Sequence, residues 1–125
     1  MAQRSAFPRR DPLAERILLD RSQRLARLAV ASWPSTVDQR LEVGEELYGD
    51  SWTTRSTEDL LTEASEEAVD LAAWSLLAVQ SLTGTDLGLD TIATVGEMIA
   101  RAIGAAAEAH AYITAAQAAL RKATK

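Results

Sequence analysis

The apolar residues of this 125-residue chain recur at steps of three and four, and no segment alternates apolar and polar residues with period two. Steps of three and four place side chains on one face of an α-helix, whereas a strand needs period two. The pattern therefore predicts an all-α fold. It is clearest in the last segment, where the stripe is Ile92, Val95, Ile99, Ile103, Ala106, His110, Ile113 and Leu120.

Start and stop signals divide this pattern into four predicted helices. Asp11-Pro12 opens the first as a cap followed by a first-turn proline, and Trp33-Pro34 is expected to end it. Ser35 or Thr36 is expected to cap the second helix and Asp90 the fourth. Ser56-Thr57-Glu58-Asp59 is expected to start the third helix, with acidic residues in its first turn. The predicted helices cover residues 11–32, 36–48, 57–82 and 90–121.

The connections between these helices are short, which favours a helical bundle. We expect a disordered N-terminal arm over residues 1–10 and a single all-helical domain over residues 11–125, four-helix bundle-like and oligomeric. Small residues such as Gly96 and Gly104 would let the last helix pack closely, within the bundle or across a dimer.

Composition excludes several classes of protein. The chain has no cysteine, so it forms neither a disulfide nor a thiolate metal site. No stretch reaches the roughly 18 consecutive apolar residues of a membrane span, and the N-terminus does not resemble a signal peptide. These features predict a cytoplasmic protein without a membrane partner.

The net charge of −5 is unevenly distributed along the chain. Residues 41–97 carry thirteen acidic residues and one arginine, while both ends of the chain are basic. So acidic a segment makes nucleic acid an unlikely partner for the middle of the chain.

The acidic residues lie in stripes, because each residue advances about 100° around a helix. One stripe is Asp59, Glu63, Glu66, Glu67 and Asp70, and a second is Asp38, Glu42, Glu45 and Glu46. A solvated acidic face is one interpretation. Against it, like charges four residues apart destabilise a helix, no lysine is interleaved, and the first stripe continues into Trp74 and Leu77. Clustered carboxylates are the ligands that Mg²⁺ uses.

The acidic segment resembles a known family at this point. Glu42-Val-Gly-Glu45, twenty-one residues and Glu67-Ala-Val-Asp70 have the ExxE…ExxD form of the MazG-like all-alpha nucleotide pyrophosphohydrolases. The resemblance covers roughly residues 37–80 and is similar to small phage and bacterial members. It implies hydrolysis of a nucleoside triphosphate to a monophosphate and pyrophosphate, with Mg²⁺ or Mn²⁺ as cofactor and a homo-oligomer, dimer or tetramer, as the assembly.

The resemblance also implies roles for individual residues. Glu42, Glu45, Glu67 and Asp70 would be metal ligands, Glu46 competes with Glu45 for that role, and Glu63 is a further ligand or water-activating base beside Glu67. The downstream phosphate-binding residues of the family have no clear counterpart, so Arg55 and Arg101 are the candidates. Trp52 and Trp74 are candidates to contact the base, or else packing residues.

Two other functions fit the same residues. The chain could be a non-enzymatic helical adaptor whose acidic face binds a basic partner. It could also be a degenerate family member that binds nucleotide or metal without turnover.

Overall fold

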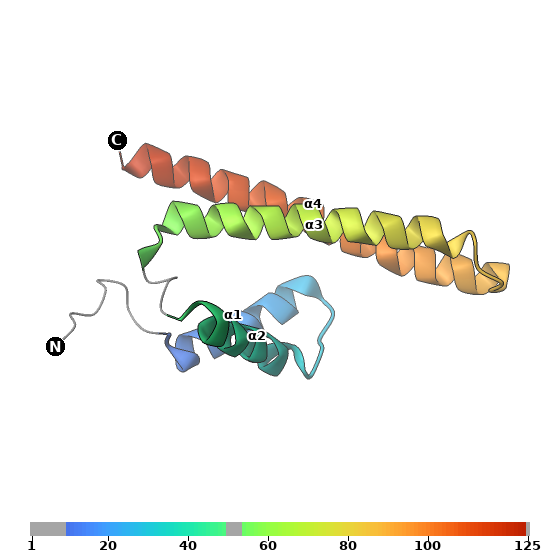
Figure 1. Ribbon diagram of the computed structural model, residues 1–125, viewed down its shortest axis with the longest axis horizontal. Helices are drawn as coiled ribbons and strands as arrows, with labels where there is room; N and C mark the ends of the chain where they lie inside the picture. The colour runs from blue at the N-terminus through green and yellow to red at the C-terminus, as the bar shows by residue number, and fades with distance from the viewer. Residues whose placement is uncertain (1–9, 50–53, 125) are drawn as a thin grey trace. The chain divides into compact units, whose positions relative to one another are not determined.

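The computed structural model describes residues 10–49 and 54–124, and these residues form four α-helices and no strand (Figure 1). The helices are α1 (Pro12–Ala26), α2 (Trp33–Tyr48), α3 (Thr57–Leu82) and α4 (Leu89–Ala123). The predicted all-α class is confirmed. The chain divides into two compact units, Met1–Arg55 with α1 and α2, and Ser56–Lys125 with α3 and α4.

The first unit begins as the sequence predicts. The Asp11 carboxylate accepts hydrogen bonds from the backbone N–H groups of Leu13 and Ala14, at 3.1 and 3.2 Å. Pro12 occupies the first turn, where its missing N–H costs nothing. Asp11 is therefore the cap of α1.

The end of α1 differs from the prediction. The helix stops at Ala26, because Arg27 adopts a left-handed conformation with φ 58° and its N–H bonds to the Arg24 carbonyl. The Gln23 side chain then accepts the Val30 N–H at 2.6 Å, which holds the chain in a loop. The prediction of a helix to residue 32 was wrong because this loop carries neither glycine nor proline.

Trp33-Pro34 starts α2 and does not end α1. Pro34 lies in the first turn of α2, where proline is tolerated, and it is buried. The Trp33 indole Nε1 donates to the Ser22 hydroxyl at 3.2 Å and so links the start of α2 to α1. Neither Ser35 nor Thr36 is the cap, since Ser32 precedes the helix.

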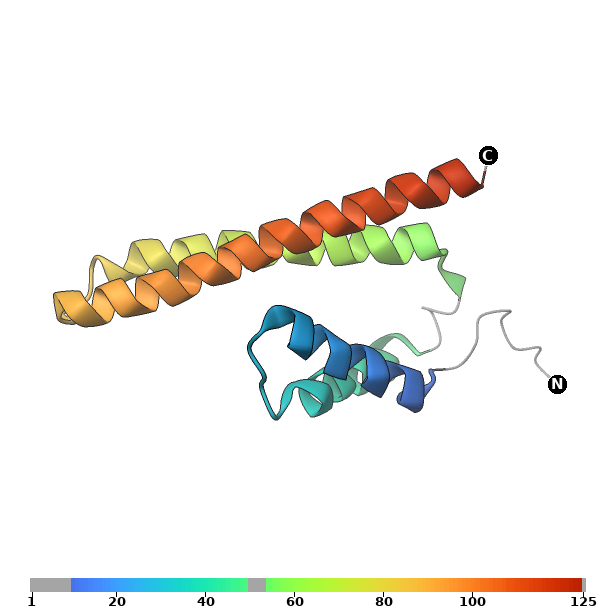
Figure 2. The same cartoon turned by 180° about the vertical axis from the view of Figure 1, so that it is seen from behind.

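The second unit is a long antiparallel hairpin in which α3 and α4 lie side by side (Figure 1; Figure 2). Ser56 caps α3 by accepting the Asp59 N–H at 3.0 Å, as its sequence context predicts. Gly88 stands at the cap position of α4 without a side-chain bond, so Asp90 lies in the first turn and is not the cap.

A seam of small side chains joins the two helices. Ala68 and Ala106 are buried, with 9% and 2% of their surface exposed. The positions of α3 that turn toward α4 recur at steps of three and four, as in a coiled coil. They are Glu58, Leu61, Ser65, Ala68, Ala72, Ser75, Val79 and Leu82, all buried or half-buried.

Two polar contacts cross this seam near the start of α3 and the end of α4. This is the open end of the hairpin, opposite the turn. Gln117 Nε2 donates to the Thr62 hydroxyl at 3.1 Å, and Arg121 Nε donates to Glu58 Oε1 at 2.6 Å. In the half of the hairpin nearer the turn, Val79 and Leu82 of α3 and Ile92, Val95 and Ile99 of α4 are half-buried. No helix of the described ranges is long and apolar enough to cross a membrane.

Candidate functional site

The acidic stripe of α3 lies on the side of that helix turned away from α4. Asp70 follows Ala68 by two residues and so lies about 200° from it around the helix, and Glu63 lies at about 220°. Glu67 sits at the edge of the same face. Glu63, Glu67 and Asp70 are all exposed. The seam with α4 therefore does not cover Glu67 or Asp70.

Trp74, one turn beyond Asp70, continues this acidic face. Its side chain is 72% exposed, and Leu71 and Leu77 beside it are about half exposed. α4 does not cover them, because it packs on the opposite side of α3. A large apolar surface of this kind on a two-helix hairpin favours a covering partner.

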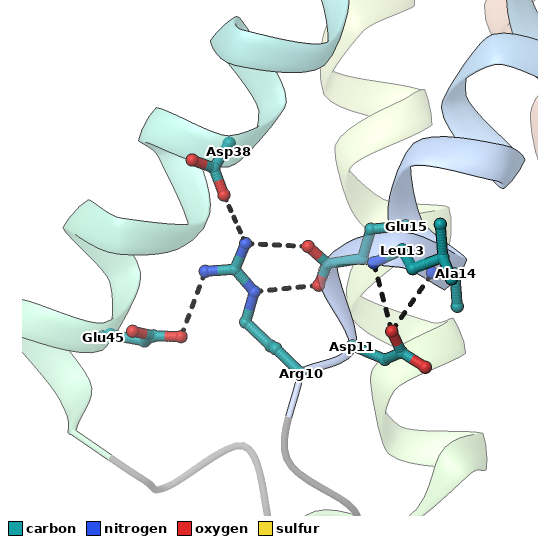
Figure 3. Close-up of polar contacts among 7 residues, drawn as sticks. All are labelled: Arg10, Asp11, Leu13, Ala14, Glu15, Asp38 and Glu45. Carbon is teal, nitrogen blue, oxygen red and sulfur yellow. Dashed lines mark hydrogen bonds and ion pairs between the residues drawn. The ribbon is translucent and has the colours of Figure 1, made fainter.

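The acidic stripe of α2 is organised by Arg10, as Figure 3 shows. The Arg10 guanidinium forms a two-pronged pair with Glu15 of α1, from Nε at 2.9 Å and from Nη2 at 2.8 Å. Nη2 also donates to Asp38 at 2.6 Å, and Nη1 donates to Glu45 at 3.2 Å, both on α2. One cation thus joins three carboxylates and ties α1 to α2.

Arg10 separates the predicted ligands of α2 into two groups. Glu45 lies toward α1 and is engaged by the guanidinium. Glu42 and Glu46 lie further round α2, are exposed, and form no ion pair with another described residue. The choice between Glu45 and Glu46 is therefore between a carboxylate held by Arg10 and one that forms no ion pair with a described residue.

The same cluster makes the stability of the first unit depend on pH. Hydrogen bonds from Arg10 lower the pKa of Glu15 below its usual value, and partial burial opposes this only in part. A lowered pKa stabilises the fold above the unfolded value of about 4.3, and the effect is lost as the pH falls through the folded pKa. We expect an NMR titration from pH 7 to 2 to show the helical structure of α1 loosening as the pH falls through the folded-state pKa of Glu15. Glu15→Gln, which has no such proton to bind, should lack the transition.

Other residues proposed from the sequence are placed as follows. Arg101 lies on α4, pairs with Glu97 at 3.1 Å, and has a side chain 74% exposed. Arg55 is exposed just before α3. Trp52 lies outside the described residues.

His110 bridges the seam of the hairpin. Its Nδ1 lies 2.8 Å from the Ser65 hydroxyl, in a hydrogen bond between α4 and α3. No carboxylate is bonded to the imidazole among the described residues, so the pair lacks the third member of a nucleophilic triad. We assign the pair to helix packing.

The donor set suits a hard cation. The candidate ligands are carboxylates only, and oxygen donors of this kind bind Mg²⁺ or Mn²⁺ and not soft metals. Across residues 10–49 and 54–124, no three Asp, Glu or His side chains are gathered as a ready-made metal site. The structure provides one pair of exposed carboxylates on each unit. They are Glu42 and Glu46 on α2, and Glu67 and Asp70 on α3.

Arg10 is the residue that the sequence did not reveal. It stands at the border of the segment predicted to be a disordered arm, and its three acidic partners lie 5, 28 and 35 residues away. No local pattern signals such a contact. Comparison with known proteins adds no assignment: no family model, no curated protein and no solved structure matches the chain.

Proposed function

We propose that this protein is a Mg²⁺-dependent pyrophosphohydrolase of nucleoside triphosphates. The observation that carries the proposal is the pair of half-motifs. Glu42 with Glu45 on α2, and Glu67 with Asp70 on α3, are each spaced by three residues, so each pair shares one helix face. The α3 pair lies on a face that no other element of its unit covers.

The residues of this site have distinct tasks in the proposal. Glu42 with Glu45 or Glu46, and Glu67 with Asp70, would be the carboxylates that hold the cation. The cation, when bound, supplies neutralisation of the phosphate charge and activation of water. Glu63 lies one helical turn from Glu67 and would be the group that accepts a proton from water. Without a cation, so acidic a surface would repel a triphosphate.

We further propose that the assembly is a homo-oligomer formed through the α3–α4 hairpin. Leu71, Trp74, Met98 and Tyr112 are each at least half exposed, and they lie on one flank of the hairpin by helical periodicity. Two such flanks laid together would complete a four-helix bundle. Sedimentation equilibrium measures the mass of the assembly directly.

One observation favours a second candidate function. The exposed Trp74 next to the exposed carboxylates of Glu67 and Asp70 is a surface that a basic, amphipathic partner helix would fit. In that case the protein is an adaptor, and binding of its partner would weaken steeply with salt.

Thermal melting with Mg²⁺ separates the two functions. At a concentration ten times its dissociation constant, a bound cation stabilises by about 1.4 kcal/mol, which raises the melting temperature by roughly 3–6 °C. KCl at matched ionic strength is the control for screening. The same samples should release pyrophosphate from at least one of the eight common ribo- and deoxyribonucleoside triphosphates. No shift beyond that of KCl at millimolar Mg²⁺ rules out the enzyme.

A further inference from the structure

Two exposed aromatic side chains lie on the same side of the α3–α4 hairpin. Trp74 follows the buried Ala68 by six residues and Tyr112 follows the buried Ala106 by six, so each lies about 120° round its helix from the seam. Because the helices are antiparallel (Figure 2), this equal offset places both side chains on one flank of the hairpin. They are 72% and 69% exposed. The aromatic flank is the surface formed by Leu71, Trp74, Met98 and Tyr112.

Trp74 and Tyr112 also lie at equal distances from the middle of this flank. The Ser65 hydroxyl and His110 Nδ1, 2.8 Å apart, mark the same height on the two helices. At about 1.5 Å per residue, Trp74 lies roughly 13 Å from that height toward the turn, and Tyr112 lies roughly 3 Å from it toward the open end. The midpoint between the two aromatic side chains falls at the buried alanine pair of the seam.

A second copy of the hairpin would fit the first if it were rotated by 180° about an axis through this midpoint, perpendicular to the aromatic flank. The rotation lays α3 of each copy along α4 of the other. Trp74 then faces Tyr112 of the second copy, and an aromatic pair contributes beyond the area that it buries. The half-exposed Leu71 faces Ala109, so a large side chain meets a small one. A self-complementary surface of this kind is what a two-fold dimer requires.

The charges at the edge of the flank fit the same rotation. Glu63 precedes Ala68 by five residues and Arg101 precedes Ala106 by five, so the rotation brings these opposite charges together. Arg101 can take a second partner, because its pair with Glu97 lies on an exposed surface. A rotation about an axis along the hairpin would instead gather the acidic halves of both α3 helices at one end, where like charges repel. Charge complementarity therefore favours the arrangement with the two turns at opposite ends.

We propose that the protein forms a two-fold dimer in which the aromatic flanks of two hairpins face each other, with Trp74 of each copy on Tyr112 of the other. This inference rests on the homo-oligomer of the proposed function and gives it a register. Aromatic side chains bury roughly 150–250 Å² each, so the four at this contact supply roughly half of the about 1,600 Å² of a standard interface. Trp74 is then an interface residue and does not contact a nucleobase.

Disulfide cross-linking tests the register, because the chain has no cysteine of its own. Leu71→Cys mixed with Ala109→Cys should give a covalent dimer on oxidation, seen on a non-reducing gel, since a disulfide forms only between Cα atoms within about 7 Å. Neither variant should cross-link alone, because like positions lie diagonally across the bundle. Leu76→Cys is the matched control: Leu76 is as exposed as Leu71 but lies on the opposite flank, so it should not cross-link with Ala109→Cys.

Sedimentation equilibrium tests the aromatic contact. Trp74→Ala and Tyr112→Ala should each raise the dissociation constant of the dimer at least about thirtyfold, as expected for an aromatic residue at the centre of an interface. The double variant should be weaker than either by much less than the product of the two effects, because both changes remove the same contact. Leu77→Ala is the control, since Leu77 is exposed on the side of α3 away from the seam and should leave the dissociation constant unchanged.

The results separate this inference from the proposed function. Cross-linking of Ala78→Cys with Met98→Cys would show that the two turns lie at the same end, and would overturn the register. An oligomer in which Leu71→Cys and Ala109→Cys do not cross-link would keep the homo-oligomer and overturn this contact. A monomer at millimolar concentration would overturn both, while Mg²⁺ binding and pyrophosphate release by that monomer would leave the enzyme standing.

Discussion

Replacement of Glu67 by glutamine is expected to abolish the stabilisation by Mg²⁺ and to reduce pyrophosphate release at least about a hundredfold. Glutamine keeps the length and shape of the side chain but removes the charge that a cation needs. Glu67 is exposed on α3, so the change creates no cavity. The fold should therefore survive, and the loss should be one of ligand binding.

The metal-free variant provides a second test of this assignment. Glu63 and Glu67 are like charges four residues apart, a pair that costs a helix roughly 0.2–0.5 kcal/mol. Without Mg²⁺, Glu67→Gln should therefore melt at the same temperature as the wild type or slightly higher. In Mg²⁺ the order should reverse. Such a reversal in the order of the two melting temperatures is not expected for a residue whose role is to stabilise α3.

Glu108→Gln is the matched control for that comparison. Glu108 is an exposed glutamate on α4, and its replacement by glutamine removes the same negative charge. It should leave both the Mg²⁺ shift and the activity intact. If Glu108→Gln reduced the Mg²⁺ shift as much as Glu67→Gln, the cation would be screening total charge and not binding at the half-motifs.

Replacement of Ala106 by leucine is expected to destabilise the hairpin by about 2 kcal/mol. Ala106 is 2% exposed in the seam between α3 and α4, where Ala68 is also buried. The three added carbon atoms have no space there unless the helices move apart. Urea unfolding followed by circular dichroism measures the loss.

Ala105→Leu is the control for this substitution, because Ala105 is the exposed neighbour on the same helix. Leucine there should change the free energy of unfolding by less than about 0.5 kcal/mol. Equal stability of the two variants would mean that the helices do not pack along this seam.

The sequence predicts the helices well, since their existence depends on local spacing. Ser56 and Asp11 cap their helices as expected because a cap needs only two or three neighbouring backbone groups. The end of α1 was missed for the opposite reason. Arg27 adopts φ 58° without being glycine, and the loop after it is held by the side chain of Gln23.

The sequence predicts each pair of candidate ligands separately, but not how the two pairs lie relative to one another. The 100° step per residue groups Glu67 with Asp70 and Glu42 with Glu45, because each pair lies within one helix. The contact of Arg10 with Glu45 joins residues 35 apart in the chain, and it depends on how α1 packs against α2. No periodicity in a single segment contains that information. Whether the two halves form one site stays a prediction.

The composition of the seam also determines which end of the α3–α4 hairpin separates first. At the open end the polar contacts of Thr62 with Gln117 and of Glu58 with Arg121 lie beside the half-buried Leu61 and Ile113, and water can replace these polar contacts at little cost. Near the turn the seam is made of aliphatic side chains, which water cannot replace. Amide protons will therefore exchange with solvent first in the opening turns of α3 and the closing turns of α4. The acidic half of α3 thus belongs to the part of the hairpin that adjusts most readily, while the turn end keeps the two helices in register.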